Sequence, residues 1–471
     1  MGITQIFILA LIAAALGRLK RGRSLTLLAA SSIAVFWLQP GQSSTSLTFW
    51  FPTFTLLIIL FSWWIVFSSG EQTWRTNLPA LLVMAGAVLL MGVGRYIDLE
   101  PLVMDIPRLM LVGVTAAVIL SPAIPLLRAD KDRSGIYIAM IVLLIGLLVV
   151  TKLPVVLTEV YKTVLSLRGK DVPGDINLFQ WLGFSYVVFR LLHTIFDRLA
   201  GRLSPMPVAD YVNYVIFFPT FIAGPIDRFE HFVIDLNNPV ALDRAGWLYA
   251  GERFFVGLFK KFVLADGLAW IALNQTFAND LKSIPWMWFL LYAYSLQIYF
   301  DFSGYTDMAI GLGRLLGIRL PENFNAPYLK PNLTQFWNSW HITLTQWFRS
   351  YYFNPVTRAL RSSRWKLPSY LVILIMQITT MVLIGLWHGI TINFLLWGLW
   401  HGVGLFLHNR WSNFMRGRSY PDRLPASARG ALKYLDPFLT FNFVSLGWIF
   451  FILPTPSLAW NAFQKLFGVG L

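Results

Sequence analysis

The chain has 471 residues, of which 56% are hydrophobic and only 13% are charged, and its formal net charge is +15. Soluble proteins carry about 25% charged residues, so this composition excludes an ordinary water-soluble fold. The apolar runs are far longer than the roughly 10-residue strands of membrane barrels, and open sheets cannot span lipid, so we predict an all-α polytopic integral membrane protein.

The surplus of basic residues lies in short loops between apolar runs. In that position basic residues set the topology and contact anionic lipids, so we expect membrane lipids and no nucleic acid as partners. The chain has no cysteine, which excludes disulfides, thiolate metal sites and a cysteine-linked acyl-enzyme.

The first third of the chain is a series of apolar segments with few polar residues inside them. The basic loop from Arg18 to Arg23 marks the cytoplasmic side. The N-terminus lacks a basic region followed by a small-residue cleavage site, so we interpret it as a retained first span. We predict spans near residues 3–17, 25–39, 47–69, 77–97, 107–127 and 136–153.

Polar residues enter the apolar pattern in the middle of the chain. Arg190, His193 and Asp197 share one helical face, which we interpret as an interfacial polar face near a span end. Further on, Gly224-Pro225 breaks an apolar run and precedes a polar segment, which is either re-entrant or an interfacial loop. His231 lies in that segment and, like His193 and His408, is expected to be interfacial.

The segment 291–317 would be a clean span without its polar side chains. Asp301 and Asp307 are six residues apart and so are not adjacent on a helix, which argues against an acid/base pair. We expect Asp301 and Asp307 to line a cavity or to bind backbone and arginine groups inside the bundle. Ser303 and Tyr305 interrupt the same apolar run. The preceding Lys260-Lys261 is expected at a membrane surface.

Three histidines, His341, His388 and His401, lie in or beside strongly apolar sequence between residues 336 and 408. Ionisable groups at membrane depth are costly and therefore functional candidates. No Asp or Glu occurs from Asn323 to Pro421, so a local serine–histidine–carboxylate triad and a metal site made of these histidines are both unsupported. For His401 we favour a structural hydrogen bond to a helix backbone.

The basic loops 349–366 and 410–433 should both be cytoplasmic. About 20 apolar residues lead up to Leu386 and about 18 lead back to Phe406, which is enough for two spans. His388 therefore lies at the middle or far end of the membrane and His341 nearer the cytoplasm. Histidines at two depths suggest a path that opens to both faces.

Several blocks resemble the membrane-bound O-acyltransferase (MBOAT) family, in its bacterial branch. They read AGPIDRFEHF, GLFKKFVLAD, YFDFSGYTDMAIGLGRLLGIRLPENFNAPYL, FWNSWHITLTQWFRSYYF and GLWHGITINFLLWGLWHG, in the family's order, over roughly residues 180–410. That branch includes alginate O-acetylation acyltransferases and the teichoic acid D-alanyl transfer protein. FDFSGYTDMAIG is closer to the alginate type, whereas FWNSWH and the spacing from His341 to His388 are closer to the D-alanyl type, so the subfamily stays open.

The resemblance implies about 11 to 14 transmembrane or re-entrant helices around a central tunnel. Residues 1–170 would be scaffold helices, 171–455 the catalytic core and 456–471 a C-terminal segment. The implied reaction is transfer of an acetyl or aminoacyl group from a cytosolic thioester to hydroxyls of an extracytoplasmic envelope polymer. His388 would act as the base and His341 would position donor or acceptor. The supporting residues expected from these blocks are Asn338, Trp337, Trp340, Trp387, Asp301, Ser303 and Tyr305.

The resemblance also implies an acyl-CoA or an acyl or aminoacyl carrier protein as donor, with no permanently bound cofactor and no metal. It implies an extracytoplasmic helper protein and a location in the bacterial inner membrane. Two alternatives remain from the residues alone. One is a lipid or protein O-acyltransferase with a long-chain donor, and the other is a lipid-linked glycan transporter or flippase, in which polar residues at depth line a substrate path.

Overall fold

The computed structural model describes residues 2–19, 21–39, 47–67, 74–93, 109–120, 134–153, 181–364, 366–417 and 426–469, with isolated positions between 156 and 166. In these ranges the regular structure is helical, apart from one isolated β-bridge between Phe324 and Trp340. The predicted all-α fold is therefore confirmed. The predicted boundary at residue 170 lies outside the described residues.

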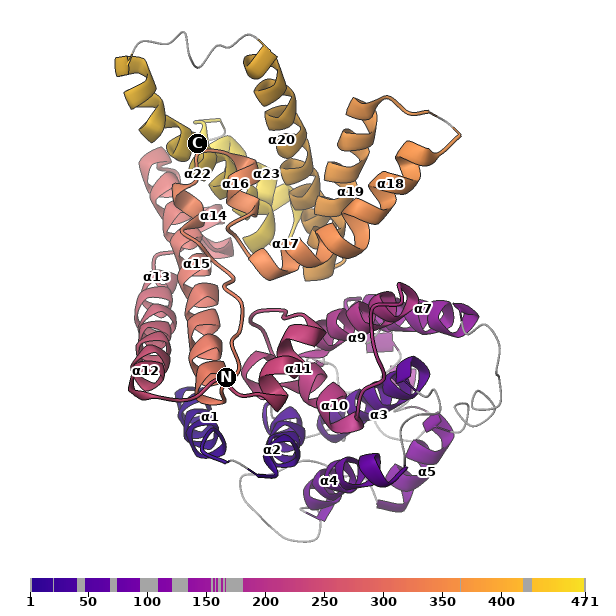
Figure 1. Ribbon diagram of the computed structural model, residues 1–471. Coiled ribbons are helices and arrows are strands. Elements are labelled where there is room, and N and C mark those ends of the chain that lie inside the picture. Colours follow the sequence, from indigo (N-terminus) through magenta and orange to yellow (C-terminus); the bar gives the residue numbers. More distant parts are fainter. Residues whose placement is uncertain are drawn as a thin grey trace. The chain divides into compact units, whose positions relative to one another are not determined.

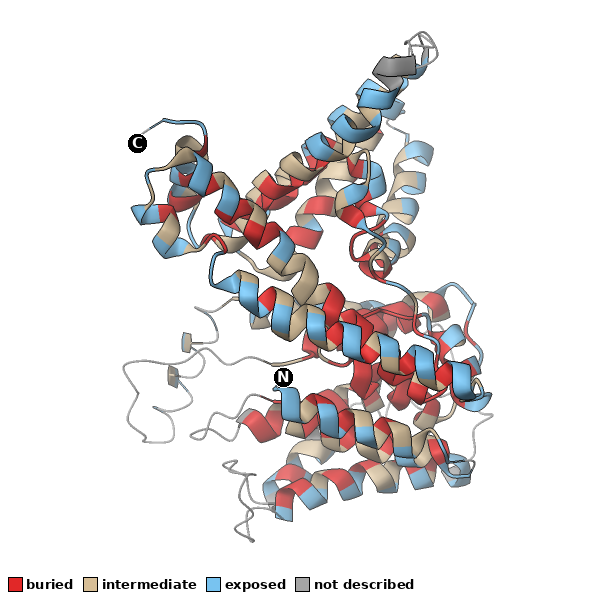
Figure 2. Cartoon of the chain, turned by 90° about the vertical axis from the view of Figure 1, so that its left-hand side faces the viewer, coloured by how far each residue is buried: buried red, intermediate tan, exposed pale blue. Residues whose placement is uncertain are grey.

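The helices form two compact units. Unit 1 contains Met1–Phe254 and Ala309–Leu320, and unit 2 contains Phe255–Met308 and Pro321–Leu471. Within each unit the buried residues face neighbouring helices and the exposed ones face outward (Figure 2). Each unit therefore has its own core.

Unit 1 begins with the helices predicted for the first third of the chain. These helices and the ones that complete the unit are α1 (Ile3–Leu16), α2 (Arg23–Trp37), α3 (Leu47–Phe67), α4 (Trp74–Val93), α5 (Leu109–Leu120), α7 (Ser134–Thr151), α9 (Phe184–Leu199), α10 (Val208–Ile216), η1 (Phe218–Thr220), α11 (Phe229–Asn237) and most of α12 (Arg244–Leu258). α5 is shorter than the predicted span 107–127, and the residues on both sides of it lie outside the described ranges.

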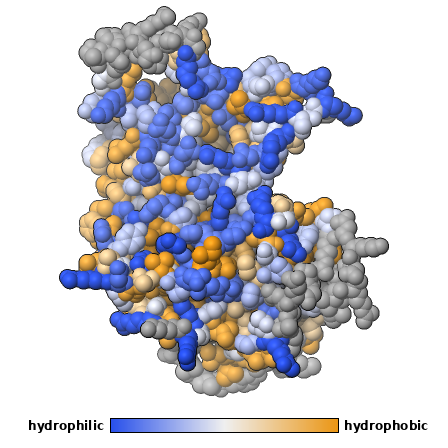
Figure 3. All heavy atoms as spheres, viewed as in Figure 1, coloured by the Kyte–Doolittle hydropathy of each residue, from blue (hydrophilic) through white to orange (hydrophobic). Residues whose placement is uncertain are grey.

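Five helices in the described ranges are long and apolar enough to cross a membrane: Thr48–Phe67, Arg75–Val93, Ser134–Thr151, Ser369–His388 and Gly430–Ile452. Two shorter apolar helices, Ile3–Leu16 and Arg23–Trp37, accompany them. Large hydrophobic side chains such as Ile138, Val142 and Ile145 of α7 are exposed on the protein surface, and hydrophobic patches are visible among polar ones in Figure 3. Such surfaces suit contact with lipid, so the chain is a multi-pass membrane protein. The count of 11 to 14 helices and the tunnel stay predictions.

Unit 2 holds the histidine-rich stretch. Its elements are η2 (Phe259–Ala265), α13 (Asp266–Ala269), α14 (Gln275–Asp280), most of α15 (Ile284–Leu315), η3 (Pro327–Leu329), α16 (Leu333–Trp337), α17 (Ile342–Phe348), η4 (Arg349–Phe353), α18 (Asn354–Ser362), α19 (Ser369–His388), α20 (Ile392–Gly417), α22 (Ala426–Ile452) and α23 (Pro456–Leu466). The two spans predicted around the WHG tripeptide correspond to α19 and α20. The predicted C-terminal segment begins where α23 begins.

α19 and α20 form a closely packed helical hairpin (Figure 1). A Cβ atom added at Gly398 would lie 2.6 Å from the Cα of Val382, and one at Gly402 would lie 2.7 Å from the Cα of Ile378. Only glycine permits this approach, which is the usual way that helices pack in lipid, where the hydrophobic effect contributes little to their association. Gly398 and Gly402 therefore fix the hairpin that carries His388.

Two lysines of η2 pair with the carboxylates of α15. Lys260 Nζ lies 2.6 Å from Asp307 Oδ2, and Lys261 forms an ion pair with Asp301. η2 is a π-helical turn, an irregularity that changes the direction of the side chains on a helix. Each lysine compensates a carboxylate of the neighbouring helix. The position of the two lysines at a membrane surface stays a prediction.

Candidate active site

His341 lies between α16 and α17 and is almost fully buried, with 3% of its surface exposed. Its backbone adopts a left-handed conformation, with φ 43° and ψ 55°. A residue other than glycine seldom adopts this conformation, which costs about 1 to 3 kcal/mol and is concentrated at functional sites. The break between two short helices therefore holds this side chain in a defined place.

Asn323 fixes the His341 ring. Its Oδ1 accepts hydrogen bonds from the backbone N–H of Thr343 at 3.1 Å and from the Thr343 hydroxyl at 2.9 Å, and it lies 3.2 Å from His341 Nδ1. The backbone N–H can only donate, so it identifies this atom of the amide as the oxygen. His341 Nδ1 must then carry the proton, and Nε2 keeps its lone pair. Nε2 has no hydrogen-bond partner among the described residues.

His388 ends α19 and lies in an aromatic surrounding. Its ring centroid is 4.5 Å from that of Trp387, 4.8 Å from Phe451 and 5.7 Å from Trp397. Trp387 also contacts His341, with ring centroids 6.2 Å apart. The structure therefore brings together two histidines that are separated by 47 residues in the sequence (388 − 341).

His341 and His388 differ in how deeply they are buried, and this difference decides which of them is better suited to act as a base. His341 lies outside the five candidate spans. Burial and, to a smaller extent, the nearby His388 lower the pKa of His341 to about 3. A base works best when its pKa is near the operating pH, so His341 is suited to accepting a hydrogen bond as a neutral ring. His388 is only partly buried, so it is the better candidate for a base.

The predicted tryptophans and Asn338 surround this pair in different ways. Trp387 bridges the two histidines, as described above. Trp340 packs into an aromatic core, with ring centroids 5.6 Å from Phe336 and 5.2 Å from Trp448. Asn338 is exposed, and its Oδ1 accepts a 2.6 Å hydrogen bond from Arg349. Trp340 thus stabilises the core, whereas Asn338 keeps its amide N–H groups for other partners.

A neighbour of the residues predicted on α15 contacts the site. Phe302 contacts the His341 ring, with centroids 4.7 Å apart. Asp301 pairs with Lys261, and Ser303 is buried with no hydrogen-bond partner for its hydroxyl among the described residues. The substrate-binding role of Asp301, Ser303 and Tyr305 stays a prediction.

His401 is fully buried on α20 among aromatic rings. Its ring centroid is 4.9 Å from Trp397 and 5.1 Å from Trp337. The expected hydrogen bond to the helix backbone is absent, since neither ring nitrogen has a hydrogen-bond partner among the described residues. Ring packing alone holds His401 in place.

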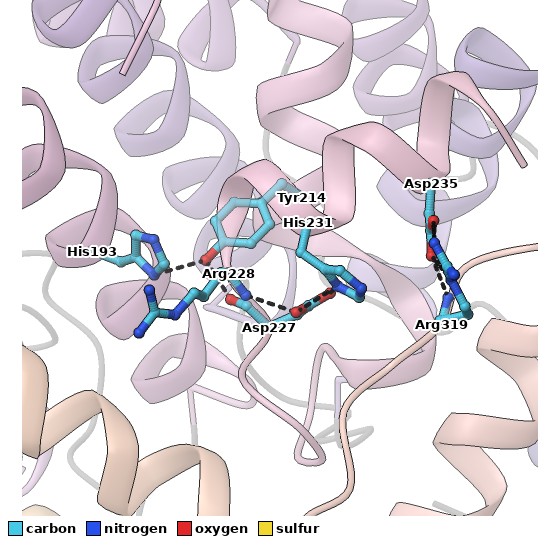
Figure 4. Close-up of polar contacts among 7 residues, drawn as sticks. All are labelled: His193, Tyr214, Asp227, Arg228, His231, Asp235 and Arg319. Carbon is cyan, nitrogen blue, oxygen red and sulfur yellow. Dashed lines mark hydrogen bonds and ion pairs between the residues drawn. The ribbon is translucent and has the colours of Figure 1, made fainter. Parts of the chain in front are cut away.

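Unit 1 contains a separate polar cluster, drawn in Figure 4. His193 Nε2 lies 3.0 Å from Asp197 Oδ2, and His231 Nδ1 lies 2.8 Å from Asp227 Oδ2. Tyr214 connects the two pairs, because its hydroxyl donates to the Asp227 carbonyl at 3.0 Å and lies 3.4 Å from His193 Nδ1. The cluster therefore ties α9, α10 and α11 together.

The interfacial interpretation of this face of α9 is wrong. Arg190 and His193 are each 2% exposed and Asp197 is 4% exposed. Arg190 donates to the carbonyl oxygens of Val215 at 2.7 Å and Thr220 at 2.9 Å, and so holds the chain after α10. The face is buried because these partners come from helices distant in sequence.

The same cluster offers donor atoms that could hold a metal. One atom each of His193, Asp197 and Glu230 lie within 4.8 Å of one another. However, Arg202 already lies 3.0 Å from Asp197 Oδ1 and neutralises this carboxylate. We therefore treat the cluster as structural.

Sequence reasoning missed Asn323. It lies in the Pro/Asn-rich connector PENFNAPYL, residues 321–329, and its link to His341 arises from chain folding over 18 residues. The signal in the sequence was the asparagine that ends the tripeptide PEN, in a connector that precedes the candidate histidine. That signal alone does not distinguish a turn residue from an orienting one.

Comparison with known proteins gives a consistent result. Residues 23–424 match the sequence model described as MBOAT, the membrane-bound O-acyltransferase family. The chain is 35% identical over 291 residues to a protein of Azotobacter vinelandii named "Probable alginate O-acetylase AlgI", covering 61% of this chain and 54% of the relative. It is 30% identical to the teichoic acid D-alanyltransferase of Bacillus subtilis, covering 65% of this chain and 76% of the relative.

A third relative comes from another polymer class. The chain is 39% identical over 246 residues to the peptidoglycan O-acetyltransferase of Helicobacter pylori, covering 51% of this chain and 43% of the relative. The aligned part thus spans about half the length of this relative and of the Azotobacter protein.

Proposed function

The chain belongs to the membrane-bound O-acyltransferase family, and we propose that it transfers an acetyl or aminoacyl group from a cytosolic thioester to hydroxyls of an extracytoplasmic cell-envelope polymer. The observation that carries this proposal is the histidine pair of unit 2. One ring is neutral with a defined tautomer, the other is partly accessible, and both lie in apolar, aromatic surroundings. The relatives named above act on alginate, teichoic acid and peptidoglycan, so the polymer itself is not specified.

The proposed reaction follows from these residues. His388 accepts the proton of an acceptor hydroxyl as its oxygen attacks the thioester carbonyl carbon. The C–O bond forms, the C–S bond breaks, and the thiolate leaves and takes a proton. The transient oxyanion needs hydrogen-bond donors, for which the Asn338 amide, the Trp387 indole and backbone N–H groups are the candidates. His341 Nε2 accepts a hydrogen bond that orients donor or acceptor.

The donor side of this proposal has electrostatic support. α18 is exposed and carries Arg358 and Arg361 without a neighbouring acid in the sequence. A basic helix on the cytoplasmic side would attract acyl-CoA or an acidic carrier protein through charge complementarity. We further propose that an extracytoplasmic helper protein assists the transfer to the polymer and that the protein lies in a bacterial inner membrane.

The test is complementation of a deletion strain with wild type or His388→Ala, followed by mass spectrometry of the envelope glycans. His408→Ala is the matched control, because His408 is partly buried on α20 and contacts Thr334. We expect wild type and the control to restore an ester that His388→Ala does not restore at equal membrane protein level. Full restoration by His388→Ala would exclude the proposed base. No ester change in the deletion strain would favour a lipid acceptor or a transporter.

A further inference from the structure

The ring of His388 lies between aromatic side chains of two further helices. Phe394 of α20 stacks on it, with ring centroids 6.0 Å apart and an angle of 23° between the ring planes. Phe451 of α22 meets it edge-on, with centroids 4.8 Å apart and an angle of 73°. Phe394 and Phe451 also contact each other, with centroids 5.1 Å apart. The orientation of the His388 ring therefore depends on how the start of α20 and the end of α22 are held together.

Phe451 lies in the last turn of its own helix, since α22 ends at Ile452. The last carbonyls of a helix lack partners inside it, and helix ends fray. The N–H of Leu453 still continues the helical pattern by donating to the Ile449 carbonyl at 3.1 Å. The carbonyl of Leu453 needs a partner from another part of the protein, because this residue is only 2% exposed.

Asn393 supplies that partner. It lies in the first turn of α20, is 2% exposed, and its Nδ2 donates to the Leu453 carbonyl at 2.5 Å. A carbonyl oxygen can only accept, so the amide atom that faces it is the nitrogen. Donor and acceptor are 60 residues apart in the sequence. This bond closes the end of α22 onto the start of α20, two residues after Phe451 and one residue before Phe394.

We propose that Asn393 is a positioning residue for the proposed base, His388. Its hydrogen bond to Leu453 fixes the last turn of α22 and so keeps Phe451 against the imidazole. The inference rests on the proposed function and deepens it, because it names a residue that orients the base from another helix. A reacting group must be held within about 0.5 Å and about 10 to 20° of its productive geometry. Without this bond the end of α22 moves, and the imidazole loses the edge contact that defines its tilt.

The variants separate positioning from general stabilisation. Asn393→Leu removes the donor at a similar volume, and Phe451→Leu removes the ring while the bond to Leu453 stays. Asn393→Gln keeps an N–H donor with a longer reach and tests rescue. Thr455→Ala is the matched control, because Thr455 lies two residues after Leu453 and caps the next helix, α23, by accepting from the Leu458 N–H at 3.3 Å. Elution as a single species verifies folding, and Asn393→Ala replaces Asn393→Leu where the latter does not pass.

The first measurement detects the ring geometry without any reaction. The chain has six histidines, so the Cε1–Hε1 correlation spectrum of full-length protein labelled with carbon-13 in histidine has few signals, and His388→Ala identifies the one of His388. Aromatic ring currents shift the signal of a neighbouring proton, so Phe451→Leu should move it. We expect Asn393→Leu to move it in the same direction, Asn393→Gln to return it toward the wild-type position, and Thr455→Ala to leave it unchanged. An unmoved signal in Asn393→Leu would overturn the proposal.

The second measurement is the ester formed in the complemented deletion strain, scaled to the level of membrane protein. Asn393→Leu and Phe451→Leu should each lower it about 10- to 100-fold, the usual cost of a misplaced reacting group, with Thr455→Ala unchanged. The double variant should lower it no further than the stronger single one, because both changes act on the same ring. Losses that multiply in the double variant would contradict the proposal. A wild type that forms no ester would refute the proposed function, while a shifted His388 signal in Asn393→Leu would leave the orientation of the ring by Asn393 standing.

Discussion

Histidines occur in both units of this protein, but in opposite electrostatic surroundings. In unit 1, His193 and His231 each lie within 3.0 Å of an aspartate carboxylate. In unit 2, His341 meets the neutral amide of Asn323 and His388 meets aromatic rings. The hydrogen bond to Asp227 raises the pKa of His231 in unit 1, whereas burial lowers the pKa of His341 in unit 2. The difference separates histidines that stabilise a fold from histidines that can act on a proton.

The largest expected effect comes from substituting one histidine of each unit and comparing the changes in kcat. His388→Ala should lower kcat about 10²- to 10⁴-fold, the usual contribution of a general base. His193→Asn should leave kcat within about threefold and lower thermal stability, because Asp197 loses a buried partner. Kinetics and unfolding of both variants in one detergent measure this contrast. Equal losses of kcat would remove the distinction between the units.

The second prediction concerns a substitution that gives His341 a carboxylate neighbour, like the histidines of unit 1. Asn323→Asp places a carboxylate 3.2 Å from His341 Nδ1, in the position of the amide oxygen. The new charge raises the pKa of His341 from its low value, so the ring becomes protonated at a higher pH than in wild type, and a protonated Nε2 can no longer accept a hydrogen bond. We expect kcat at the acidic end of the pH profile to fall about 10- to 100-fold below wild type and to recover as the pH rises.

Asn332→Ala is the control for that substitution. Asn332 caps α16 by accepting from the Gln335 N–H at 2.9 Å, so its loss should cost about 1 kcal/mol of stability and leave the pH profile of kcat unchanged. A pH profile of Asn323→Asp identical to wild type would show that the amide does not determine the state of His341.

A third prediction concerns the ion pairs of unit 2. Asp307→Asn leaves Lys260 without its 2.6 Å partner, and the Lys260 side chain is only 25% exposed. We expect the free energy of unfolding to fall by about 1 to 3 kcal/mol, because a partly buried ammonium loses its compensation. Denaturant unfolding in mild detergent measures it. Lys282→Gln, which removes a cation with no ion pair in the described ranges, should change stability by less than about 0.5 kcal/mol.

The smallest effect is the pH dependence from unit 1. The hydrogen bond to Asp227 raises the pKa of His231, and burial opposes this only in part. A raised folded-state pKa means that the stabilisation is complete below the unfolded pKa of about 6.5 and is lost as pH rises through the folded pKa. The side chain is 44% exposed, so the effect should stay below about 1 kcal/mol. His231→Gln should abolish this slope in a melting series from pH 5.5 to 8.5, and a retained slope would assign it elsewhere.

Much of the helical layout was predictable from the chain alone. Apolar runs of span length correspond to α1–α4, α7, α19 and α20, because burying backbone polar groups in lipid leaves the helix as the only local solution. The lengths of the two apolar runs likewise predicted that His388 lies near the point where they meet, and His388 ends α19. Periodicity also placed Arg190, His193 and Asp197 on one helical face. It did not predict whether this face packs against other helices or faces the membrane interface.

The partners of the polar residues were decided only by tertiary structure. Lys260 and Asp307 lie 47 residues apart, and Asn323 meets His341 across 18 residues. Composition and periodicity describe the neighbours of a residue along its own helix. Hydrophobic patterning therefore predicts which segments of the chain form helices. Hydrogen bonds between helices depend instead on which faces meet and at what depth. That is why the sequence by itself made His341 and His388 candidates, while the amide that orients His341 emerged only from the folded chain.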